Sequence, residues 1–179
     1  MNKILKLTLI LFLVCAVVAG VLGGVNELTK DRIKQITEEK RAKAYSAVLS
    51  ADGYEPVECD AGALKVNNIY KGTGDEGWVV ESTFSGAQGL ITMATGVDKD
   101  YKCTGISIIS HSETSGLGAN AASTSEVGVN FRSQFIGEGE DIALTKAGGN
   151  IDALTGATIT SRSVTEAVAN AIAAVKTLG

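Results

Sequence analysis

The chain has 179 residues, about 45% of them apolar, which is enough for one compact domain and an additional segment. Its formal net charge at pH 7 is −4, and no basic cluster is interleaved with aromatic residues. These features argue against a nucleic-acid partner.

The additional segment lies at the N-terminus. No charged residue occurs from Leu7 to Asn26, and this run is about as long as a helix that crosses a bilayer core. Lys3 and Lys6 precede it, as in a signal peptide, but the apolar part of a signal peptide is shorter, about 7–15 residues. We therefore expect an anchor in the lipid bilayer, with a cleaved signal peptide as the alternative.

The charges that flank the span leave its orientation open. Two lysines precede it, and a run of basic residues follows between Lys30 and Lys43. The positive-inside rule counts Lys and Arg, and this count alone points to a cytoplasmic domain. Interleaved acidic residues from Glu27 to Glu39 leave the flank nearly neutral, so the conflict stays open at this point.

The next residues predict a helix followed by strands. Residues 27–50 have a helical composition, and Asp52-Gly53 with Pro56 predicts the end of that helix. In the strand-like region, Trp78, Val80 and Phe84 alternate with polar residues, which predicts a half-buried antiparallel meander. Its strands are expected at 64–71, 78–84, 90–97 and 102–110.

The second half of the chain ends in an amphipathic helix. Residues 111–130 are rich in small polar residues and predict an ordered loop or short surface helices, and 142–146 are expected as a further short strand. Ser163 and Glu166 have capping-box spacing, which places the start of the last helix near Val164. Its apolar face consists of Val164, Ala167, Val168, Ala171, Ile172 and Val175.

Strands framed by helices, without a βαβ rhythm, predict an α+β fold with an antiparallel or mixed sheet. We expect a short N-terminal tail and transmembrane helix at 1–26, a juxtamembrane helix and linker at 27–56, and the folded domain at 57–179.

Few side chains are candidates for unaided chemistry. His111 is the single histidine, and the sequence places no carboxylate pair or serine beside it. Cys59 and Cys103 lack metal-ligand spacing, and either form a disulfide or remain free thiols. We therefore expect no catalytic residue and no metal site, and a bound cofactor would carry any chemistry.

Two motifs of small and hydroxyl residues carry the functional signal: HSETSGLG at 111–118 and DALTGAT at 152–158. Each is weak alone, and neither is a dinucleotide or Walker A motif. Together, on an anchored α+β domain, they resemble the flavin-binding domain of the G subunit of Rnf-type electron-transport complexes. The C subunit of the sodium-pumping NADH:quinone oxidoreductase shares that domain. Ser115 stands where the family usually has proline, and Phe131 where it often has tryptophan.

The resemblance implies covalent FMN. The last hydroxyl residue of the second motif, here Thr158, would carry the FMN 5′-phosphate in a phosphoester that a separate flavin transferase installs from FAD. Gly156 and Ala157 leave room for the phosphate, and a helix N-terminus favours its charge. Thr155, which shares the motif with Gly156 and Ala157, and Thr160 are alternative attachment points.

The remaining motif residues have supporting roles in this hypothesis. Asp152 would cap the turn or bind the transferase's metal, and capping is the preferred assignment. Leu117, between Gly116 and Gly118, would pack against the flavin ring, while Glu113 and Thr114 would offer polar contacts near it. The alternative for this segment is a loop that only covers the sheet.

The resemblance further implies an extracytoplasmic domain, contrary to the Lys and Arg count. It implies an electron relay rather than a self-contained enzyme, held among the other membrane and redox subunits of an Rnf-type complex that couples ferredoxin:NAD electron transfer to ion translocation. The alternatives are the same domain in another membrane redox system, such as the quinone-reducing sodium pump or a respiratory reductase, and a cofactor-free anchored binding module.

Overall fold

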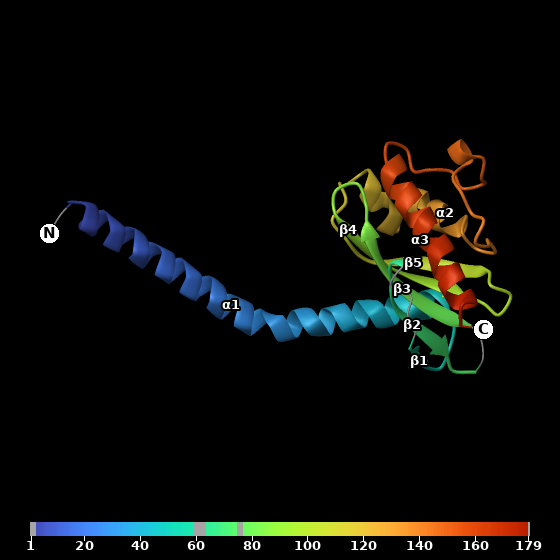
Figure 1. Cartoon of the computed structure of the whole chain (residues 1–179), viewed down its shortest axis with the longest axis horizontal. Helices are drawn as coiled ribbons and strands as arrows, with labels where there is room; N and C mark the ends of the chain where they lie inside the picture. The colour runs from blue at the N-terminus through green and yellow to red at the C-terminus, as the bar shows by residue number, and fades with distance from the viewer. Residues whose placement is uncertain (1–2, 59–63, 75–76, 179) are drawn as a thin grey trace. The chain divides into compact units, whose positions relative to one another are not determined.

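The computed structural model describes residues 3–58, 64–74 and 77–178. Two compact units are distinguished, Met1–Lys40 and Arg41–Gly179. The elements, shown in Figure 1, are α1 (Lys3–Val48), β1 (Tyr54–Val57), β2 (Val66–Gly72), β3 (Trp78–Ser85), β4 (Leu90–Val97), β5 (Cys103–His111), the short 3-10 helix η2 (Gly118–Ala122), α2 (Glu126–Ser133), a second short 3-10 helix η3 (Thr145–Ala147) and α3 (Thr158–Lys176).

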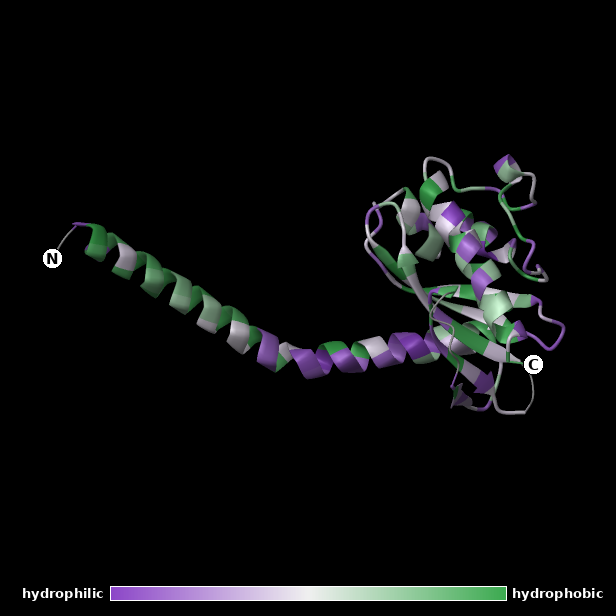
Figure 2. Cartoon of the chain, viewed as in Figure 1, coloured by the Kyte–Doolittle hydropathy of each residue, from purple (hydrophilic) through white to green (hydrophobic). Residues whose placement is uncertain are grey.

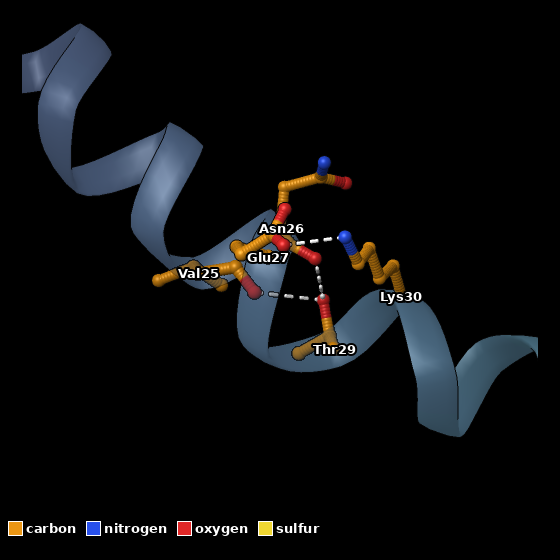
Figure 3. A network of polar contacts seen from close by, with 5 residues as sticks. All are labelled: Val25, Asn26, Glu27, Thr29 and Lys30. Atoms are coloured by element: carbon orange, nitrogen blue, oxygen red, sulfur yellow. Dashed lines mark hydrogen bonds and ion pairs between the residues drawn. The ribbon is translucent and has the colours of Figure 1, made fainter.

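The first unit is the greater part of α1, a helix of 46 residues. Its N-terminal part is long and apolar enough to cross a membrane, and Figure 2 shows this apolar run giving way to a mainly hydrophilic stretch. The change falls where the polar contacts of Figure 3 begin: Thr29 Oγ1 donates to the carbonyl of Val25 at 2.8 Å, and Lys30 pairs with Glu27. The helix α1 continues through this change of polarity, and the Thr29 hydroxyl is satisfied by its own helix backbone.

In the second unit, five strands form one sheet in the order β1-β2-β3-β4-β5, with every neighbouring pair antiparallel. This confirms the predicted α+β class and meander. The edge strand β1 was not predicted, because Pro56 was interpreted only as the end of a helix. Pro56 instead pairs with Tyr70 at the sheet edge, where a missing N–H is tolerated.

Helix α3 covers one face of the sheet. Phe84 on β3 and Met93 on β4 belong to the same buried cluster as the apolar face of α3. The predicted apolar residues of α3 are all buried, at most 5% exposed: Val164, Ala167, Val168, Ala171, Ile172 and Val175. This packing fixes the line of α3 on the sheet and thereby places its N-terminus.

The opposite face is also covered, so the prediction of a half-buried sheet was wrong. The C-terminal end of α1 within the second unit packs Tyr45 and Val48 against Val79. Glu81, one of the polar residues that alternate with Trp78, Val80 and Phe84 and were predicted to form the exposed face, is only 2% exposed. It accepts hydrogen bonds from Arg41 Nη2 at 3.1 Å and from the Tyr45 hydroxyl at 2.7 Å, and these partners compensate for burial of its charge.

Two other predictions concern the connections. The prediction of short helices or an ordered loop at 111–130 is confirmed by η2 and α2. The strand expected at 142–146 is not formed: Leu144 makes a single bridge with Ile151, and η3 follows it. The physical reason is the return of the chain through Gly148, which has a positive φ of 86°. Cys59 lies outside the described residues, whereas Cys103 is a buried free thiol.

Phe135 is fully buried and contacts Phe131 edge to face, with 5.3 Å between the ring centroids. Phe135→Ala is expected to lower the free energy of unfolding by about 3–5 kcal/mol, because a cavity replaces the ring. Ile136, the next residue, is 59% exposed, and Ile136→Ala should change the free energy of unfolding by less than about 0.5 kcal/mol. Denaturant unfolding followed by fluorescence of the single tryptophan, Trp78, measures both. Equal losses would contradict this view of the core.

Candidate functional site

The candidate site is built on the turn that leads into α3. The N–H of Ala157 bonds to the carbonyl of Leu154 at 3.0 Å, and Gly156 between them has a positive φ of 73°. Glycine adopts this conformation without strain. Ser161 Oγ accepts from the N–H of Leu154 and donates to the carbonyl of Ala157, both at 2.9 Å. The turn is thus fastened to the first turn of the helix.

The capping box predicted at Ser163 is wrong, because α3 already begins at Thr158. Its N-cap position is Ala157, and no side chain caps the helix. Capping by Asp152 is likewise not observed: among the described residues, its exposed carboxylate has no hydrogen bond. The side chain of Ser161 bonds to Leu154 and Ala157, outside the first turn of α3, so the N–H groups of that turn remain available to an anion.

The hydroxyl groups near this turn differ in exposure. Thr160 and Ser161 are fully buried, and each hydroxyl donates to a partner within the protein. Thr155 is exposed and Thr158 is half-buried. Of the alternative attachment points, Thr160 is therefore closed to a reagent from solvent, whereas Thr155 is open.

Thr158 lines a hollow of about 340 Å³. Two basic residues, Lys146 and Arg162, line the same hollow, together with Glu166. Neither basic residue belongs to the two motifs. The sequence could have indicated Arg162, because it stands four positions after Thr158 in a predicted helical region and so shares a helix face with it. No sequence pattern indicates Lys146, because only the tertiary path of the chain around η3 brings it near α3.

Asp152 and Thr155 line a different hollow, of about 400 Å³, together with Phe131 and Gln134. The side-chain amide of Gln134 bonds to both backbone groups of Asp152, accepting from its N–H at 2.7 Å and donating to its carbonyl at 3.3 Å. Gln134 thus fixes the start of the DALTGAT motif, a role that the sequence did not indicate.

The structure brings the two motifs together. Leu117 lies directly beside Gly156: a Cβ built on this glycine would stand 3.0 Å from Leu117 Cδ2. Leu117 remains 43% exposed, so it offers an apolar surface at the turn. Its loop is closed by hydrogen bonds from the N–H groups of Leu117 and Ala119 to the carbonyl of Thr114, both at 3.2 Å, with Gly116 at a positive φ of 77°.

Glu113 connects the two motifs below this surface. Its buried carboxylate accepts from the Thr160 hydroxyl and from the N–H of Gln88, the latter at 3.0 Å. Burial raises the pKa of this carboxyl, but hydrogen bonds from Gln88, Thr160, Gly89 and Ala87 outweigh burial and lower the pKa overall. Glu113 is therefore ionised at neutral pH.

His111 and Cys103 are two further titratable groups of the second unit. His111 is exposed, and its Nδ1 accepts from the N–H of Glu113 at 3.2 Å. Burial raises the pKa of the Cys103 thiol to about 12, so it is protonated at neutral pH. Within residues 3–58, 64–74 and 77–178, no group of three or more His, Cys, Asp or Glu could hold a metal ion.

Comparison with known proteins gives the family. The model of the FMN-binding domain matches residues 86–173, and the model of the RnfG N-terminal region matches residues 1–48. The G subunit of the ion-translocating oxidoreductase complex of Methanosarcina acetivorans is 35% identical, over 96% of this chain and 94% of its own length. The chain belongs to the RnfG family.

Other relatives agree with this assignment. The G subunit of the Na(+)-translocating ferredoxin:NAD(+) oxidoreductase complex of Acetobacterium woodii is 32% identical over 92% of this chain and 88% of its own length. The corresponding subunit of a proton-translocating complex from Clostridium ljungdahlii is 42% identical, over 60% of this chain and 57% of its own length. The FMN-binding match includes both motifs and supports FMN as the cofactor of this RnfG family member.

The lowered pKa of Glu113 makes a prediction about stability. Its folded-state pKa lies below the unfolded value near 4.5, so the ionised carboxylate stabilises the fold above that pH, and this stabilisation is lost as the pH falls through the folded-state pKa. Glu113→Gln should therefore lower the free energy of unfolding by about 1–3 kcal/mol at neutral pH, and progressively less in acid.

Denaturant unfolding at a series of pH values measures this difference. Glu55→Gln, which changes an exposed carboxylate on β1, is the matched control and should stay close to the parent protein throughout. If Glu113→Gln lowers the free energy of unfolding as much in acid as at neutral pH, the stabilisation does not come from the ionised carboxylate.

Proposed function

We propose that this chain is a membrane-anchored flavoprotein subunit that carries FMN on Thr158 and relays electrons within an Rnf-type complex. In such a complex, electron transfer between ferredoxin and NAD is coupled to ion translocation. Support comes from the FMN-binding domain match, the apolar α1 and the names of the relatives. The observation that carries the proposal is the half-buried Thr158, which lines a hollow at the start of α3, where the N-cap residue makes no side-chain hydrogen bond.

The residues around Thr158 fit a phosphate ester. The first turn of α3 offers N–H groups at the positive end of the helix dipole. Lys146 and Arg162 add positive charge to the hollow that Thr158 lines. A phosphate diester carries one negative charge, so this surrounding would stabilise the attached group more than the free hydroxyl.

The ring of the flavin needs an apolar contact and a backbone that approaches closely. Leu117, exposed beside Gly156, supplies the apolar contact, and Gly116 and Gly118 keep its loop free of bulk. Thr114 lies in the same exposed loop. When bound, FMN supplies reversible oxidation and reduction, which no side chain of this site provides.

Attachment requires a flavin transferase and FAD. The Thr158 Oγ would form a bond to the FMN phosphorus as the phosphoanhydride bond of FAD breaks. AMP leaves, and the hydroxyl proton is released with it, so no oxidant or reductant is consumed. Asp152 has an exposed carboxylate free of hydrogen bonds among the described residues, which suits the proposed contact with the metal of the transferase.

The attachment residue is tested by two threonine variants. Thr158→Val should abolish covalent flavin, because the valine has no oxygen to esterify. Thr155→Val removes the other exposed hydroxyl of the motif and should keep it. The measurement is flavin fluorescence of the denatured protein in a gel, with the protein made in cells that contain the transferase, together with peptide mass spectrometry.

On the parent peptide, the added mass should be one FMN less one water, located on Thr158. A fluorescent Thr158→Val band, with the modification on Thr155, would move the attachment point. A dark parent band would remove the covalent flavin from the proposal and favour a binding module.

The domain is proposed to lie outside the cytoplasm, joined to the bilayer by α1. Alkaline phosphatase fused after Gly179 should be active, because it matures only after export, whereas green fluorescent protein at the same position should stay dark. The reverse pair of results would place the domain in the cytoplasm, as the Lys and Arg count alone suggests.

A further inference from the structure

The Glu113 carboxylate joins three segments that are distant in the sequence. One oxygen accepts from the N–H of Gln88, in the turn between β3 and β4. The other accepts from the hydroxyl of Thr160, in the first turn of α3. Glu113 itself follows β5 at the start of the HSETSGLG motif. A single buried charge therefore fixes the start of α3 relative to the sheet.

The space around this contact is tightly filled. A Cβ on Gly118 would stand 2.2 Å from Glu113 Oε2 and 2.6 Å from Thr160 Oγ1, and a Cβ on Gly86 would stand 2.4 Å from Glu113 Oε1. The backbone thus approaches the carboxylate from both sides. A side chain at Gly118 or Gly86 would therefore collide with the Glu113 carboxylate.

Thr160 and Glu113 are buried and bonded to each other, so a reagent in solvent does not reach the Thr160 hydroxyl. Thr158 is in the same helical turn and is accessible. The contact acts on Thr158 through the backbone, by setting the rotation and position of the turn that presents its hydroxyl. A group-transfer reaction is sensitive to such placement.

We propose that Glu113 is a positioning residue for flavin attachment, which holds Thr160 so that the Thr158 hydroxyl is presented for transfer of FMN from FAD. This inference rests on the proposed function. It differs from a contact between Glu113 and the flavin, because the carboxylate is directed toward Thr160 and the turn at Gln88. In the transfer, the Thr158 Oγ–P bond replaces the phosphoanhydride bond of FAD, and AMP leaves with the proton.

The chain offers a matched pair of buried threonines on α3. Thr160→Val removes the hydroxyl that Glu113 holds. Thr165→Val removes a hydroxyl that is 3% exposed and bonds within the helix, to the carbonyl of Ser161 at 2.9 Å. Thr165 also lines the hollow of Thr158, so this control includes the effect of a lost hydroxyl on that hollow. Both changes keep the side-chain shape and cost one buried hydrogen bond. A general loss of stability would affect both variants, whereas loss of positioning affects only Thr160→Val.

The experiment measures the rate of flavin attachment to the full-length protein in detergent. The protein is made without the transferase and is then incubated with transferase and FAD. Thr160→Val and Glu113→Gln should each be flavinylated about tenfold more slowly, equivalent to about 1.4 kcal/mol, because each loses the same charged hydrogen bond. Thr165→Val should match the parent, and Thr160→Ser, which keeps the hydroxyl, should restore the rate. The double variant that combines Glu113→Gln and Thr160→Val should be flavinylated no more slowly than either single variant, because both changes remove the same interaction.

Two further readouts separate the possible outcomes. Thermal unfolding verifies that Thr160→Val and Thr165→Val are folded, and the midpoint potential of the attached flavin should be unchanged in Thr160→Val. Equal attachment rates for Thr160→Val and the parent, or an equal slowing in Thr165→Val, would overturn the positioning role. A parent protein that takes up no flavin would instead overturn the proposed function.

Discussion

The packing of α3 against the sheet is the constraint on which the rest of the structure depends. Its apolar face is almost completely excluded from water, with Val164, Val168 and Ile172 fully buried. From Val164 onward, this burial fixes the axis of the helix and the face that it turns to the sheet, and it thereby determines where the candidate site stands. The bonds of Ser161 and Thr160 hold the first turn of the helix to Leu154 and Glu113.

The two faces of the sheet are covered by different means. On one face, α3 and the aromatic pair of Phe131 and Phe135 form an apolar core. On the other, the end of α1 brings Arg41 and Tyr45 to the buried Glu81. Burial, together with the hydrogen bond to Glu81, raises the pKa of Tyr45, so its hydroxyl keeps its proton and continues to donate.

The candidate site uses few groups, and their arrangement suits a tether more than a deep pocket. Its hydroxyl groups differ in burial, its basic side chains come from α3 and from η3, and Leu117 offers an exposed apolar side chain. A covalent bond would keep FMN on the protein without enclosing the ring. Such an arrangement is consistent with a relay whose ring must stay accessible to other subunits.

The sequence alone determined the long apolar helix, four of the five strands, the amphipathic face of α3 and the two motifs, because each depends on local periodicity or on residue type. It misplaced the start of α3, since Ser163 had capping spacing whereas the bonds that begin the helix come from Ser161 and Glu113. Only the tertiary structure decided that Glu81 is buried, that Thr160 is closed while Thr158 is accessible, and that Lys146 joins the site. Each of these depends on contacts between segments distant in the sequence, which local patterns do not encode.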